Sequence, residues 1–125
     1  MYRERMEKLK EWKVSKNRKP LIIRGARQVG KTWLMKEFGK LYYEKFAYIN
    51  FDNNSRMDIL FNEEFDLDRI IQGLKIESGI NIEPENTLII FDEIQECKEA
   101  RTALKSFHID GRFDVIATGS LLGVK

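Results

Sequence analysis

The chain has 125 residues, a formal net charge of +2 and one cysteine, Cys97. Its length suits one domain with one core, and 42% hydrophobic with 34% charged residues is typical of folded soluble proteins. No apolar run approaches the ~20 residues that span a bilayer, and the charged N-terminus lacks the apolar centre of a signal peptide. A single cysteine excludes an internal disulfide framework. We therefore expect a cytoplasmic protein with no membrane contact.

The charge is unevenly distributed along the chain. Residues 1–19 hold eight basic and three acidic residues, a net charge of +5, whereas residues 52–99 hold four basic and thirteen acidic residues, a net charge of −9. We interpret the basic segment as the solvated face of a helix. Contact with nucleic acid or with an acidic partner is the alternative.

The first 19 residues are expected to form a helix and a basic linker that precede a core over residues 20–125. The helix is expected over residues 2–13, where apolar side chains recur along one stripe, at Tyr2, Met6, Leu9 and Trp12. Residues 16–20 are polar and end at Pro20, which blocks a helix and suits the start of a strand.

Within the core, short apolar runs alternate with segments of helical periodicity. The expected elements are strands over 21–24, 46–51, 87–91 and 113–118, and helices over 31–41, 57–61, 66–79 and 98–107. The helix over 31–41 is expected to turn Leu34, Phe38 and Leu41 toward the core. Strands that alternate with helices predict an open parallel α/β sheet with right-handed crossovers.

A phosphate-binding pattern lies between the first strand and the helix that follows it. The segment is Gly25-Ala26-Arg27-Gln28-Val29-Gly30-Lys31-Thr32, which fills every fixed position of G-x-x-x-x-G-K-[ST]. Such a loop brings backbone N–H groups and a helix N-terminus against phosphate oxygens. Lys31 is expected to contact the β- and γ-phosphates, and Thr32 to offer its hydroxyl to Mg²⁺. Trp33 is expected either to stack on the adenine or to pack within the protein.

Two carboxylates follow the apolar strand over 87–91. Magnesium prefers oxygen ligands and keeps several waters, so a carboxylate at a strand end could hold a magnesium-bound water. We assign that role to Asp92. Glu93 would polarise the attacking water or accept its proton. The alternative is that both residues form an acidic cap on the following helix.

The last strand ends in Thr118-Gly119-Ser120. A polar side chain at the tip of a neighbouring strand can sense the γ-phosphate or orient the attacking water, so Thr118 and Ser120 are further catalytic candidates. The alternative for Ser120 is a helix N-cap.

Three segments together resemble a prokaryotic AAA-domain ATPase family of the P-loop group. They are Arg24 to Thr32, Ile89 to Gln95 and Ile116 to Ser120, and they occur in the family's order. The resemblance implies a three-layer α/β sandwich with a mainly parallel sheet of order 5-1-4-3-2. The fourth strand would then lie between the first and third, and all three segments would meet at one sheet edge, where ligands of α/β sheets bind. ATP and Mg²⁺ are the implied ligands.

The family's pattern extends past Ser120 into a fifth strand, a helical lid and a C-terminal domain that is often nuclease-like, whereas this sequence stops at Lys125. We therefore expect the ATPase core of a larger protein, weak or inactive by itself, with its first strand at an edge open to self-association. The arginine that neutralises γ-phosphate charge is not assigned. The expected function is Mg²⁺-dependent ATP hydrolysis, and the alternative is a nucleotide-gated switch with little turnover. A GTPase is disfavoured because no Asn-Lys-x-Asp guanine-binding motif is present.

Overall fold

The computed structural model describes residues 2–15, 19–25 and 29–120. In chain order, the elements are α1 (Tyr2–Val14), β1 (Leu21–Gly25), α2 (Val29–Tyr42), β2 (Lys45–Asn50), α3 (Ser55–Asn62), α4 (Leu67–Ser78), β3 (Thr87–Asp92), the 3₁₀ turn η1 (Ile94–Glu96), α5 (Lys98–Asp110) and β4 (Asp114–Ser120). Among these ranges, none of the helices has the length and apolar character needed to cross a membrane.

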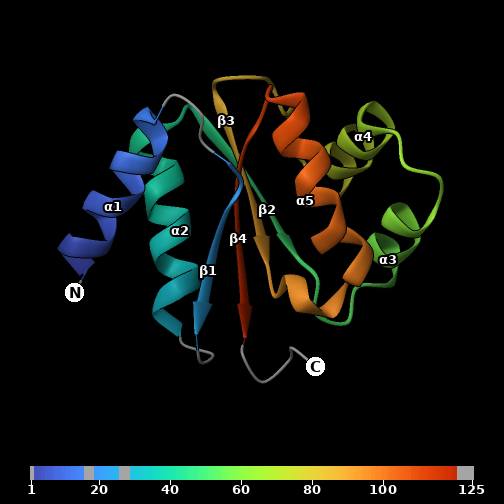
Figure 1. Ribbon diagram of the computed structural model, residues 1–125, viewed down its shortest axis with the longest axis horizontal. Coiled ribbons are helices and arrows are strands. Elements are labelled where there is room, and N and C mark those ends of the chain that lie inside the picture. Colours follow the sequence, from blue (N-terminus) through green and yellow to red (C-terminus); the bar gives the residue numbers. More distant parts are fainter. Residues whose placement is uncertain (1, 16–18, 26–28, 121–125) are drawn as a thin grey trace.

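The four strands form one parallel sheet of order β1-β4-β3-β2. Helices α1 and α2 cover one face, and α3, α4 and α5 cover the other (Figure 1). The sandwich has three layers, as predicted. The order 1-4-3-2 confirms the predicted placement of the last strand between the first and third. It also makes β3 and β4 the inner strands of the sheet.

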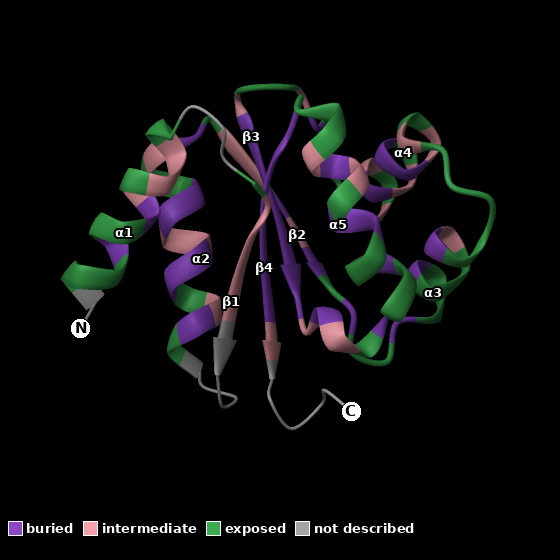
Figure 2. Cartoon of the chain, in the orientation of Figure 1, coloured by how far each residue is buried: buried purple, intermediate pink, exposed green. Residues whose placement is uncertain are grey.

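The side chains of β3 alternate between the two faces of the sheet, and this decides which face Asp92 is on. All six residues of β3 are buried, because strands flank it on both sides and helices cover both faces (Figure 2). Ile89 and Phe91 pack in the cluster under α3, α4 and α5, whereas Leu88 and Ile90 pack in the cluster under α1 and α2. Side chains alternate along a strand, so Asp92 shares the face of Leu88 and Ile90. The carboxylate therefore faces the α2 side of the sheet.

The predicted buried stripe of α2 was wrong at one position. Leu34, Met35 and Phe38 are buried, but 55% of Leu41 is exposed. At 3.6 residues per turn, each three-residue step falls about 60° short of a full turn. Leu41 lies two such steps after Met35, so it has rotated away from the sheet.

An ion pair between α3 and α4 leads to a prediction about pH. The Arg56 guanidinium donates from Nε to Glu77 Oε1 at 2.8 Å and from a terminal nitrogen to Oε2 at 2.9 Å, and Asn54 donates to Oε2 at 3.1 Å. The hydrogen bonds from Arg56, with a smaller contribution from Asn54, lower the pKa of Glu77 below its ordinary value of 4.5. A carboxyl whose folded pKa is depressed stabilises the fold above its unfolded pKa, and this stabilisation is lost as the pH falls through the folded pKa.

We therefore expect Glu77→Gln to lower the midpoint of thermal unfolding at pH 7, and the difference from wild type to shrink below about pH 4. Melting curves at a series of pH values measure this. Glu64→Gln, at an exposed position, is the control and should show little difference at any pH. A Glu77→Gln deficit that stays constant from pH 7 to pH 3 would contradict the assignment.

Candidate nucleotide site

The carboxyl ends of the parallel strands meet at one edge of the sheet, and α2 begins there (Figure 1). Gly25 ends β1 and pairs with Ser120, the last residue of β4. Val29 is the first residue of α2, so the chain from Gly25 to Val29 joins β1 to α2 at this edge. The intervening residues Ala26, Arg27 and Gln28, which the sequence assigns to nucleotide binding, lie outside the described residues.

Asp92 is the centre of the site. Its side chain ends β3, is only 4% exposed and accepts three hydrogen bonds from hydroxyl groups. Thr32 Oγ1 donates to Oδ2 at 2.8 Å, the Tyr48 hydroxyl donates to the same oxygen at 2.5 Å, and Thr118 Oγ1 donates to Oδ1 at 2.7 Å. The fold thus brings together three of the predicted residues, Thr32, Asp92 and Thr118, from α2, β3 and β4.

Sequence reasoning missed Tyr48. It lies on β2, in the register opposite Ile90, and so shares the α2 face of the sheet with Asp92. Lys36 Nζ lies 4.1 Å from the centroid of the Tyr48 ring. Burial, together with the hydrogen bond to Asp92 and the charge of that carboxylate, raises the pKa of Tyr48 above its ordinary value of 10. The hydroxyl therefore keeps its proton and remains a donor to Asp92.

The Thr118 hydroxyl connects both carboxylate residues at the end of β3. Besides donating to Asp92, it accepts the backbone N–H of Glu93 at 3.4 Å. Glu93 has φ 57° and ψ 46°, the left-handed conformation, which is uncommon for residues other than glycine. Backbone strain of this kind concentrates at functional sites.

The Glu93 side chain is held by a residue of η1. Gln95 Nε2 donates to Glu93 Oε1 at 2.7 Å. A β-carbon placed on Gly119 would lie 3.2 Å from Gln95 Oε1. The absence of a side chain at Gly119 therefore provides space for the Gln95 side chain. Glu93 as a whole is partly exposed.

Gly30, Lys31 and Trp33, which are also predicted site residues, lie near the start of α2. Lys31 is 7% exposed, and Trp33 is 53% exposed. Among the residues that the structure describes, none has a heavy atom that a β-carbon placed on Gly30 would meet within 4 Å. These residues leave open space against the backbone of Gly30, as close approach of a phosphate requires.

The oxygen groups around Asp92 suit magnesium. Thr32 offers a hydroxyl and Asp92 a carboxylate, both hard oxygen donors of the kind that Mg²⁺ takes. In the ranges that the structure describes, no group of three or more His, Cys, Asp or Glu side chains could enclose a metal ion. A site with so few protein ligands fits a cation that keeps several of its waters rather than one bound in an all-protein cage.

A parallel sheet of order 1-4-3-2 between two helical layers, with a lysine-bearing helix starting at its carboxyl edge, defines a P-loop NTPase-like α/β domain. Residues 17–124 match the sequence profile of the family described as AAA domain. The match covers most of the chain, so the chain belongs to the AAA domain family, and nucleotide binding in general follows from that membership. No curated protein sequence matches the chain.

Proposed function

We propose that this domain binds ATP together with Mg²⁺ and hydrolyses it to ADP and phosphate. One observation carries the proposal: the Thr32 hydroxyl, which directly follows Lys31 in the chain, lies 2.8 Å from the carboxylate of Asp92, 60 residues further on. A hydroxyl and a carboxylate at the start of a phosphate-binding helix are the donors that a nucleotide-bound Mg²⁺ needs.

The binding roles follow from the charges. Lys31 would place its ammonium group against the β- and γ-phosphates, while backbone N–H groups at the start of α2 would donate to phosphate oxygens. Thr32 and Asp92 would hold Mg²⁺, directly and through a bound water. When bound, Mg²⁺ neutralises charge that builds on the phosphates during transfer. Trp33 offers an exposed ring to the adenine.

Glu93 is the proposed general base. It would accept a proton from a water whose oxygen forms a bond to the γ-phosphorus, while the bond from that phosphorus to the oxygen of ADP breaks. Gln95 Nε2 donates to Oε1 of the Glu93 carboxylate at 2.7 Å and so orients the group. Thr118 supports both acidic residues. Ser120, the last residue of β4, is proposed to sense the γ-phosphate.

The midpoint of thermal unfolding tests this assignment of ligand and cation. ATP with Mg²⁺ at about 100 times Kd should stabilise the fold by about 2.7 kcal/mol, a rise of about 10 °C for a domain of this size. ATP with a chelator should give a smaller rise, and GTP with Mg²⁺ is the comparison for base preference. Equal stabilisation with Mg²⁺ and with the chelator would contradict the role given to Thr32 and Asp92.

A further inference from the structure

We propose that Tyr48 is a positioning residue for magnesium: its hydroxyl fixes the Asp92 carboxylate in the orientation in which it accepts a hydrogen bond from a magnesium-bound water. This inference rests on the proposed Mg²⁺–ATP function. Tyr48 itself would touch neither the nucleotide nor the cation.

The first argument is the geometry of the carboxylate. An ionised carboxylate offers about four acceptor positions. Thr32 and Tyr48 take two on Oδ2, and Thr118 takes one on Oδ1. About one position is left for a further donor, which is the number that one metal-bound water requires. Three donors from different elements also prevent rotation of the group about its Cβ–Cγ bond.

The second argument is the side from which Tyr48 reaches Asp92. Thr32 is the residue expected to turn its oxygen to Mg²⁺, and Thr118 also accepts the N–H of Glu93 at 3.4 Å. Tyr48 is the donor from β2, on the side of Asp92 away from β4. Tyr48 can therefore remain hydrogen-bonded to Asp92 when nucleotide and cation bind, while the charge on the carboxylate that it contacts changes.

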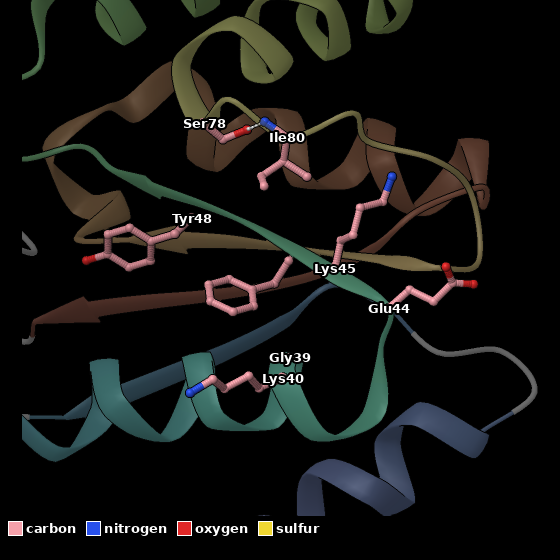
Figure 3. Close-up of a pocket in the computed structure, with 8 residues that line it drawn as sticks. Gly39, Lys40, Glu44, Lys45, Tyr48, Ser78 and Ile80 are labelled. Carbon is pink, nitrogen blue, oxygen red and sulfur yellow. Dashed lines mark hydrogen bonds between the residues drawn. The ribbon is translucent and has the colours of Figure 1, made fainter.

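The third argument is that the ring of Tyr48 is held in place. It packs against the hydrophobic cluster under α1 and α2, and Lys36 Nζ lies 4.1 Å from its centroid. The ring also borders a cavity of about 420 Å³ that Gly39, Lys40 and Phe46 line. Figure 3 shows the hydroxyl directed away from the end of the cavity where Lys45 lies. A ring packed in this way delivers its hydroxyl to one place.

The chain provides a matched control in a second tyrosine–aspartate pair. The Tyr43 hydroxyl donates to Asp114 Oδ2 at 2.5 Å, and both residues are buried. Asp114 begins β4, four residues before Thr118, so it lies about 13 Å along the strand from the site at 3.3 Å per residue. The two pairs have the same chemistry and differ in location.

The test is the Mg²⁺ concentration at which ATP affinity reaches half of its maximum, measured by calorimetry with chelator-buffered Mg²⁺. Tyr48→Phe should raise this concentration about tenfold, as expected for loss of a group that orients a metal-binding side chain. ATP affinity without Mg²⁺ should stay within about twofold of wild type. Tyr43→Phe should leave the Mg²⁺ midpoint unchanged, whatever its effect on melting.

If the Mg²⁺ concentration at half-maximal ATP affinity were the same in Tyr48→Phe as in the wild type, or lower, the inference would be overturned. The proposed function would stand. Failure of the proposed function is visible separately, in a wild-type protein whose ATP binding is absent or independent of Mg²⁺.

A second measurement does not require a stable Tyr48→Phe variant. The chain has four tyrosines, so labelling with 3-fluorotyrosine gives four fluorine signals. Three signals are assigned from the variants Tyr2→Phe, Tyr42→Phe and Tyr43→Phe, and the remaining signal belongs to Tyr48. Mg²⁺ added to the ATP-bound protein should shift the signal of Tyr48 and leave that of Tyr43 in place. An unmoved Tyr48 signal would also overturn the inference.

Discussion

Replacing Lys31 with alanine is expected to abolish the thermal stabilisation by ATP and Mg²⁺. Lys31 is buried in the first turn of α2, at the edge where β1, β3 and β4 end. Hydrogen bonds and ion pairs to charged groups contribute about 1.5–3 kcal/mol each, and a single ammonium group facing two phosphates makes more than one such contact. A loss of at least about 100-fold in ATP affinity follows. The measurement is the unfolding midpoint with and without ligand.

Two control variants separate lost binding from lost folding. Lys31→Met keeps most of the aliphatic stem and removes the charge, so it should melt near wild type without ligand and still fail to respond to ATP. Lys40→Ala removes an exposed lysine from the same helix and should respond as wild type does. A normal ATP shift in Lys31→Met would show that the loop at 25–32 does not hold the phosphates through this residue.

The helix and strand pattern could be predicted because its signals are local. Asp66, where the sequence predicts that a helix starts, caps α4 by accepting the N–H of Asp68 at 3.1 Å, and Gly79 follows α4 in the left-handed conformation. The errors were in the helix bounds. Helix α3 begins at Ser55 rather than 57 because Asn54 accepts the N–H of Met57 at 3.1 Å. Helix α5 continues three residues past 107, until Gly111 stops it with φ 77°.

The site was predictable where a short motif carries the chemistry and not where distant strands supply it. Thr32 and Asp92 belong to recognisable motifs, and the structure brings them together. Tyr48 is one of several aromatic residues in the sequence, and nothing local distinguishes it. Its contact with Asp92 depends on β2 pairing with β3 in one register. The left-handed backbone of Glu93 and the turn η1 after it depend likewise on the packing at the end of β3.

Glu93→Gln is expected to lower the rate of phosphate release from ATP about 10²–10⁴-fold, the range of a positioned general base, with ATP affinity retained. Glutamine has nearly the same shape but cannot take a proton from water, so the left-handed backbone and the donation to Thr118 should survive. Phosphate release at saturating ATP measures the effect. Glu96→Gln, at an exposed position in the same turn, is the control and should keep the wild-type rate.

The same comparison separates hydrolysis from the nucleotide-gated switch. The structure supplies features that would favour each function. Gln95 Nε2 donates to one oxygen of Glu93 at 2.7 Å. This hydrogen bond orients the base for catalysis, but if it must break before the carboxylate binds water, it slows turnover. If the wild type binds Mg²⁺–ATP and releases phosphate no faster than Glu93→Gln, Glu93 takes no part in turnover. If in addition both rates are negligible, the domain acts as a switch. A wild-type rate that exceeds the variant's 100-fold would establish Glu93 as the base, because the two proteins differ only in whether that side chain can accept a proton.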